Sequence, residues 1–215
     1  MEIYDTEEER LDALKRWWKE NGQSTIVGLV LGIAVILGWN YWQDHKKAQA
    51  EQASALYSQL IQAIGADKKE SAEKLAERIK EQYPKTEYAA YSGLFLAKLK
   101  VQQGDLPKAQ AILKDIAAGP NKELSNVAKI RQVRLMLASG EYEQGLQLIN
   151  NVDPATSSSF SGNYDELTGD LYVALDRLDQ ARSSYQKALD NGYKSPLLQF
   201  KIDDLTASEK IEIQK

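Results

Sequence analysis

The first strong feature in the pattern of apolar and polar positions is a long uncharged run near the amino terminus. The 23 residues between Glu20 and Asp44 carry no charged side chain, and Ile26 to Trp39 is almost purely apolar. A hydrocarbon core about 30 Å thick needs roughly 20 residues of helix, and a helix satisfies its own backbone polar groups in lipid. The run therefore predicts one transmembrane helix over residues 21–43.

Aromatic side chains flank this run on both sides. Trp17 and Trp18 precede it, and Trp39, Tyr41 and Trp42 close it. The rings of Trp and Tyr favour the two interfaces between lipid and water, so these five residues are predicted membrane anchors. All four tryptophans of the protein lie in this segment.

Two other structures fit an apolar run of this kind: a cleaved signal peptide ending at the small residues 48–50, and a buried helix of a soluble protein. Against the first, 20 residues with seven acidic side chains precede the run, whereas a signal peptide begins with a short basic segment. Against the second, nothing else in the chain is apolar enough to enclose such a helix.

Two glycines four residues apart lie within the span. Gly28 and Gly32 share one helix face, and such a small-xxx-small pair lets two helix backbones approach closely in lipid. Such pairs also arise by chance in glycine-rich spans. The hypothesis is that this face contacts the span of a partner protein.

Beyond the span, a pattern of small and aromatic residues recurs. The small and aromatic positions of a tetratricopeptide unit, which is about 34 residues long, are matched by Gly169, Tyr172, Ala181, Tyr185 and Ala188. The equivalents of Ala181 in earlier units are spaced 36, 36 and 37 residues apart, at Gly145, Ala109 and Ala72. A small residue here lets two helices approach, and stacked hairpins bury faces that a single hairpin leaves exposed.

These patterns predict an all-α fold, with one N-terminal transmembrane helix followed by a tetratricopeptide-like solenoid of about four helical hairpins and a terminal helix. Helix-stopping prolines near the ends of three units support the hairpin boundaries, at Pro84, Pro120 and Pro154. The predicted helices are 5–19, 24–64, 71–82, 87–103, 106–117, 122–139, 142–150, 162–176, 178–191 and 196–207. Residues 157–161 are predicted to form a polar connector.

Tetratricopeptide arrays usually bind ligands on the concave side, which is lined by the first helix of each hairpin. Carried over by position, this predicts an apolar trough with a few cations, which suits an extended or partly unfolded polypeptide. The alternative is that these side chains form core or pack on the terminal helix around Phe200. The positions are Tyr57, Ile61, Ile64, Tyr91, Leu94, Lys98, Val101, Val127, Ile130, Arg134 and Leu137.

Charge limits the possible partners and the orientation. Residues 45–215 carry 23 basic and 23 acidic side chains, so no excess positive charge is available for binding nucleic acid. Residues 6–20 hold four Lys or Arg and residues 44–58 hold two, which favours a cytoplasmic segment 1–20 and an exported domain 44–215. In a bacterium the exported domain would be periplasmic, anchored to the inner membrane.

Candidate catalytic and metal-binding groups are sparse. The single histidine, His45, neighbours the membrane interface, whereas zinc or copper sites need several converging nitrogen or sulfur ligands. The chain has no cysteine, no phosphate-binding glycine loop and no nucleophile elbow. We therefore expect no catalytic residue, no metal and no cofactor, and a protein that binds other proteins.

Three stretches resemble the YfgM family of inner-membrane proteins: residues 1–4 (MEIY), 15–22 (KRWWKENG) and 38–42 (GWNYW). The resemblance implies a single-span protein in the lipid bilayer, with a cytoplasmic N-terminus and a periplasmic tetratricopeptide-like domain. It also implies an accessory role at the SecYEG translocon, beside a PpiD-like membrane-anchored periplasmic chaperone. Contact with nascent secreted polypeptides is a further expectation. Two other functions stay open: an independent periplasmic chaperone, and a non-catalytic subunit of an envelope-building complex.

Overall fold

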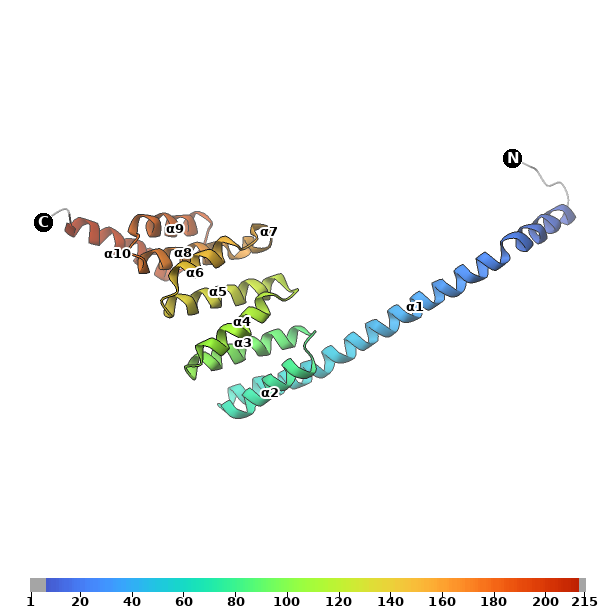
Figure 1. The fold of residues 1–215 in the computed structure, drawn as a ribbon, viewed down its shortest axis with the longest axis horizontal. Coiled ribbons are helices and arrows are strands. Elements are labelled where there is room, and N and C mark those ends of the chain that lie inside the picture. The colour runs from blue at the N-terminus through green and yellow to red at the C-terminus, as the bar shows by residue number, and fades with distance from the viewer. Residues whose placement is uncertain (1–6, 213–215) are drawn as a thin grey trace. The chain divides into compact units, whose positions relative to one another are not determined.

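The computed structural model describes residues 7–212, with side chains from 9 to 205, and every regular element in this part of the chain is helical. The all-α prediction is confirmed. The elements are α1 (Glu7–Gly65), α2 (Lys69–Gln82), α3 (Glu87–Gln102), α4 (Leu106–Ala117), α5 (Lys122–Ala138), α6 (Tyr142–Asn150), α7 (Pro154–Ser157), the 3-10 helix η1 (Ser158–Phe160), α8 (Ser161–Ala174), α9 (Leu178–Asp190) and α10 (Pro196–Glu212) (Figure 1). Contacts divide the chain into two units, residues 1–52 and 53–215.

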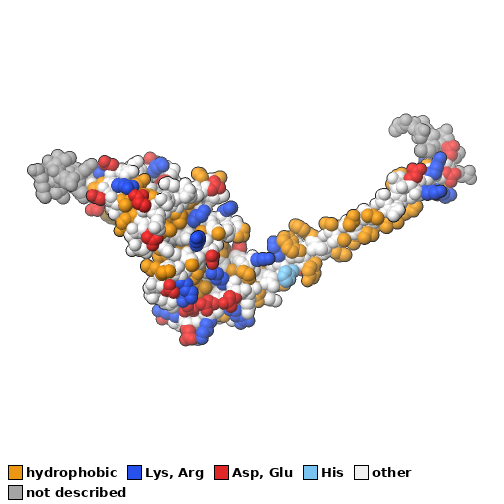
Figure 2. Space-filling model, viewed as in Figure 1, with side chains coloured by type: hydrophobic (Ala, Val, Ile, Leu, Met, Phe, Trp, Pro, Cys, Tyr) orange, Lys and Arg blue, Asp and Glu red, His pale blue; other side chains and the backbone are white. Residues whose placement is uncertain are grey.

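The first unit holds the part of α1 that is long and apolar enough to cross a bilayer. The apolar side chains between Ile26 and Leu37 are exposed, with Leu29 at 65% and Val35 at 70%. Figure 2 shows such side chains gathered along the helix. Because no described residue encloses them, the structure gives no support to the alternative of a buried soluble helix.

Helix α1 is unbroken through residues 20–23, where the sequence pattern predicts a break. The polar side chains here bond back to the helix: Asn21 Nδ2 donates to the Trp17 carbonyl at 3.1 Å, and Thr25 Oγ1 donates to the Asn21 carbonyl at 2.9 Å. Gly22 is covered by the Trp18 indole, which would lie 3.3 Å from an added Cβ. The predicted break is therefore wrong.

The second unit is a stack of helical hairpins, made by the end of α1 with α2, α3 with α4, α5 with α6, and α8 with α9, followed by α10 (Figure 1). One buried apolar cluster includes Leu60 and Leu113, a second includes Val133 and Leu171, and a third surrounds Leu198. The first two clusters draw from successive hairpins, which is how stacked hairpins bury their apolar faces together.

The turn inside each hairpin has the same geometry. Its central residue, repeated every 36 or 37 positions, has a positive φ of 52°, 79°, 78° and 58° at Asp67, Gly104, Gly140 and Asp176. The next residue donates its N–H to a carbonyl five positions earlier, at 2.8 to 2.9 Å, for Lys68, Asp105, Glu141 and Arg177. This hydrogen bond closes a helix end, and Gly or Asp is suited to the left-handed backbone it needs. The recurrence confirms the tandem hairpins.

The connector before the fourth hairpin holds the largest departure from the predicted boundaries in this unit. Residues 157–161 form the end of α7, η1 and the start of α8, and are not an irregular connector. Buried Asn126 of α5 holds this segment: its Nδ2 donates to the Thr156 carbonyl at 2.9 Å, and its Oδ1 accepts from the Tyr164 hydroxyl at 2.8 Å. Burial raises the pKa of Tyr164 to about 12, so this hydroxyl stays a donor.

The residues predicted to set the spacing between helices are buried, apart from half-buried Tyr172. The buried set is Ala72, Ala109, Gly145, Gly169, Ala181, Tyr185 and Ala188. A Cβ at Gly169 would stand 2.2 Å from Cε1 of Tyr185, so the tyrosine ring occupies the space that a side chain would need. The Tyr185 hydroxyl donates to Asp170 Oδ1 at 2.8 Å, which fixes the ring.

Candidate functional site

The candidate site is the surface formed by the first helices of three hairpins, namely residues 53–65 of α1 with α3 and α5. We call it the A-helix face. Of the predicted trough residues, those exposed are Ile61, Ile64, Tyr91, Lys98, Val101 and Arg134. Those half-buried are Tyr57, Val127 and Leu137.

Two predicted trough residues lie in the core instead. Leu94 is 8% exposed and belongs to the cluster that joins α1 to α5, and Ile130 is 6% exposed and belongs to the cluster of α5, α6 and α8. Exposed Tyr91 and Lys98 lie only one turn from Leu94. Sequence spacing therefore identifies the helices of the face better than it separates an exposed position from a buried one.

Three tyrosines join α1 to α3 on the A-helix face. The ring centre of Tyr57 lies 5.5 Å from that of Tyr88 and 5.9 Å from that of Tyr91, and the last two are 6.3 Å apart. Aromatic rings attract at these distances. Burial, followed by the neighbouring Tyr91 and Tyr88, raises the pKa of Tyr57, so the phenol is neutral at physiological pH. The cluster offers an aromatic surface to a partner because Tyr91 is 37% exposed.

A cavity of about 320 Å³ lies among α3, α4 and α5 on the same face. Its lining is apolar apart from Gln102 and three cations, Lys98, Arg131 and Arg134. Arg131 Nη1 donates to the Leu94 carbonyl of α3 at 3.1 Å, which ties α5 to α3 beside the cavity. The sequence pattern does not assign Arg131 to the face, although its position three residues before Arg134 places both on one side of α5.

The helices of the A-helix face carry almost no acidic side chain. Residues 52–66, 88–104 and 124–140 contain no Asp or Glu. Their basic residues are Lys98, Lys100, Lys129, Arg131 and Arg134. The acids of these hairpins lie on α2, α4 and α6, in the turns, and at the starts of α3 and α5. The face is therefore apolar and cationic, although residues 45–215 as a whole are formally neutral.

The fourth hairpin differs, because its first helix carries three acids, two of which pair with a lysine of α10. Lys201 of α10 lies 2.9 Å from Glu166 Oε1 and 2.7 Å from Asp170 Oδ1, both on α8. Burial alone would lower the pKa of Lys201, but the hydrogen bonds to Asp170 and Glu166 outweigh it and raise that pKa. These contacts hold α10 on the hairpin. Across the described residues, no three His, Asp or Glu side chains are grouped to hold a metal.

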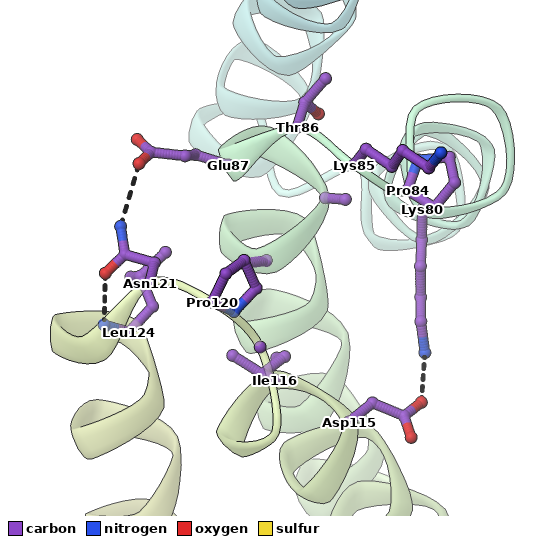
Figure 3. A pocket seen from close by; sticks show the side chains of 13 residues that line it. Lys80, Pro84, Lys85, Thr86, Glu87, Asp115, Ile116, Pro120, Asn121 and Leu124 are labelled. Carbon is purple, nitrogen blue, oxygen red and sulfur yellow. Dashed lines mark hydrogen bonds and ion pairs between the residues drawn. The ribbon is translucent and has the colours of Figure 1, made fainter.

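A second cavity, of about 660 Å³, lies between the loop that joins α2 to α3 and the loop that joins α4 to α5 (Figure 3). Its lining includes Pro84, Ala89, Ile116, Pro120 and Leu124. Two polar contacts frame it: Lys80 Nζ donates to Asp115 Oδ2 at 3.4 Å, and Asn121 Nδ2 donates to Glu87 Oε1 at 2.9 Å. No pattern in the sequence predicts this cavity. A related signal is the recurrent proline, since each loop brings one to the same edge of the stack.

In the first unit, the predicted anchors and contact face are exposed. The anchors are 46–76% exposed: Trp17, Trp18, Trp39, Tyr41 and Trp42. Lys46 Nζ lies 3.9 Å from the centre of the Trp42 ring, in cation–π geometry. A Cβ at Gly28 or Gly32 would meet no atom of the described side chains within 4 Å, so this face of the span has room for a partner helix.

Comparison with known proteins gives a family for this architecture. The tetratricopeptide repeat-like domain family matches residues 15–207. A protein of Haemophilus influenzae named "Ancillary SecYEG translocon subunit" is 33% identical over 86% of this chain and 90% of its own length. Proteins with the same name from Aggregatibacter actinomycetemcomitans and Escherichia coli K12 are 32% and 28% identical, over 93% and 96% of this chain and 97% and 100% of their own lengths.

No solved structure matches the chain. The family match spans the apolar helix and the hairpins together. The alignments with the relatives extend over 90–100% of the length of each relative. The chain therefore belongs to the family of ancillary SecYEG translocon subunits and carries a tetratricopeptide repeat-like domain.

Proposed function

We propose that the protein is a single-span, non-catalytic accessory subunit of the SecYEG translocon in the bacterial inner membrane. The observation that carries the proposal is the similarity to proteins of that name along the whole chain, span included. A helix that can cross the membrane, with interfacial aromatic residues at both ends, supplies the anchor that such a subunit needs.

The proposed orientation has the N-terminal segment in the cytoplasm and the hairpin domain in the periplasm. Arg10, Lys15, Arg16 and Lys19 precede the span, and Lys46 and Lys47 follow it. Basic residues near a span favour the cytoplasmic side, and this bias supports the orientation. A reporter fused to the C-terminus that is active only in the periplasm tests it.

Within this role, the hairpin domain binds proteins on the periplasmic side. It holds a PpiD-like membrane-anchored chaperone near the channel, and its A-helix face contacts emerging polypeptides. The support is the surface itself: exposed Ile61, Tyr91 and Val101 offer apolar contacts, and the three cations of the cavity offer charge. Extended polypeptides use both kinds of contact.

In-cell photo-crosslinking from matched positions tests the proposal. In the span, a crosslinker at Ile36 lies on the face of Gly28 and Gly32, and one at Val30 lies on the opposite face. On the domain, Tyr91 is matched by exposed Lys114 of α4. We expect the crosslinker at Ile36 to give more crosslinks to the channel than the one at Val30. We expect the crosslinker at Tyr91 to capture more chaperone or exported chains than the one at Lys114.

The absence of channel crosslinks from both span positions would overturn the translocon role. Exported chains captured at Tyr91 without any channel component would favour an independent chaperone. Capture of envelope synthases in place of both would favour a subunit of an envelope-building complex.

A further inference from the structure

Three cations surround the cavity of the A-helix face without a carboxylate to balance them. In the part of the chain that the structure describes, neither Lys98 nor Arg131 nor Arg134 forms an ion pair. Two other cations packed into the stack are paired with acids, Lys100 with Glu73 and Lys201 with two acids of α8. The cavity therefore gathers three cations, none of them paired with an acid among the described residues, around one apolar lining.

The arrangement keeps like charges together. Arg131 and Arg134 are three residues apart on α5, a spacing at which like charges destabilise a helix. Partial burial and then Arg134 lower the pKa of Arg131, yet an arginine stays charged. The Arg131 guanidinium donates one N–H to the Leu94 carbonyl. This hydrogen bond fixes the position of the group and leaves its other donors for a ligand. A bound anion would relieve the repulsion.

The walls of the cavity indicate what kind of anion fits. Val101, Leu113 and Leu135 are apolar, and apolar walls favour a carboxylate carried by a chain with apolar side chains over a small, fully hydrated ion. Lys98 and Tyr91 are seven residues apart, so they lie on one face of α3 about 10 Å apart along the helix. An extended polypeptide rises about 3.3 Å per residue, so side chains about three residues apart reach both.

We propose that the cavity of Lys98, Arg131 and Arg134 is a carboxylate-binding subsite, through which the A-helix face selects polypeptide segments that carry Asp or Glu beside apolar residues. The inference rests on the proposed function, because it names the class of polypeptide that the same face binds. Arginine is suited to this subsite because its planar group binds a carboxylate through two parallel hydrogen bonds.

Direct binding measurements on the full chain test the subsite. The protein is held in phosphatidylcholine nanodiscs, and binding is followed by fluorescence anisotropy of a short labelled peptide with Glu spaced among Leu and Ser, compared with the same peptide carrying Gln. We expect the Glu peptide to bind at least about tenfold more tightly, with a preference that weakens as salt is added. Equal affinity for the two peptides would overturn the proposal.

Two variants with the same change in charge localise the effect. Lys98→Gln with Arg131→Gln and Arg134→Gln should bring the affinities for the two peptides within about twofold of each other, because the charged hydrogen bonds to the Glu carboxylates are lost. Lys114→Gln with Lys122→Gln and Lys187→Gln removes three exposed cations that do not line the cavity, and should keep the preference. An equal loss of the preference for the Glu peptide in both triple variants would mean that the charge of the domain as a whole, and no local subsite, causes the preference.

Two further measurements test whether a loss of binding comes from unfolding and whether the ligand is a lipid headgroup. Lys98→Gln alone removes an exposed cation without a described partner, so it should weaken Glu-peptide binding about threefold or more with an unchanged melting temperature. If the cavity triple abolishes binding to phosphatidylglycerol vesicles but leaves peptide binding intact, the ligand is a lipid headgroup and the proposal fails. Channel crosslinking from Ile36 reports on the proposed function separately, since it does not depend on the cavity.

Discussion

Lys201 of α10 donates to both carboxylate oxygens of Asp170 on α8, at 2.7 and 2.9 Å, and Asp170 also accepts from the Tyr185 hydroxyl of α9. One carboxylate thus joins three helices. The carboxylate that accepts the hydrogen bond closing the hairpin therefore also holds the last helix against it, together with buried Leu198 and Leu205.

Replacing Lys201 by Met should destabilise the domain by about 1–3 kcal/mol, because Asp170 and Glu166 would be left side by side without a cation. The loss is below that of a fully buried pair since the Lys201 side chain is 30% exposed. Urea unfolding of the full chain in detergent measures it, and proteolysis should cut α10 first. Lys194→Met, at an exposed position, serves as the control. Equal stability of the two variants would show that α10 is held by apolar packing alone.

Acid should weaken the contact between α2 and α3. A hydrogen bond from Lys100, stronger than the opposing effect of burial, holds the pKa of Glu73 below its ordinary 4.5. A depressed carboxyl pKa contributes stability above the unfolded value, and this contribution is lost as the pH falls through the folded value. Glu73→Gln should therefore cost about 1 kcal/mol at pH 7 and less at pH about 3. Urea midpoints at both pH values check this, and a pH-independent cost would contradict it.

Alanine at two buried glycines should give different results. Gly169→Ala places a methyl group 2.2 Å from the ring of Tyr185, which is fixed by its hydroxyl, and should destabilise by about 1–3 kcal/mol. At Gly145, the nearest atom is a methyl group of Leu171 at 3.0 Å, the mobile end of a side chain. The gain of about 1 kcal/mol in helix propensity should then leave Gly145→Ala close to neutral. Thermal melts of both variants compare them, and the reverse order would refute the packing argument.

In the span, Gly28→Leu with Gly32→Leu should reduce co-purification with the translocon about threefold or more while leaving membrane insertion intact. Among the described residues, no side chain lies within 4 Å of a Cβ at either position, so we expect a loss to come from a lost partner contact. Val30→Leu with Ile33→Leu provides a control away from this face. Recovery equal to that of the unaltered protein would remove this face from the list of contacts.

Much of the fold follows from local signals that a sequence displays. The bounds of α4 and α6 match the predicted ranges because glycines and prolines end the neighbouring segments. The α7 and η1 segment could not be predicted, since it depends on a buried contact of Asn126 with residues 30 and 38 positions away. The unbroken α1 was missed because Asn21 and Gly22 are poor helix formers in isolation.

The site is predictable to a lesser degree. Helical spacing places Lys98, Val101 and Arg134 beside one cavity, but it cannot distinguish them from Leu94 and Ile130, whose burial depends on the neighbouring helices. The cavity near Pro120 forms between two loops that are far apart in the sequence, so no local pattern describes it.

The placement of all four tryptophans between Trp17 and Trp42 has an optical consequence. The hairpin domain contributes tyrosine emission only, so intrinsic indole fluorescence reports on the membrane segment alone. A single indole introduced at Val101, which is 37% exposed, would emit from the hairpin domain and could be followed after the native four tryptophans are changed to phenylalanine. One emission spectrum would then register a ligand entering the cavity that Val101 lines, without any attached dye.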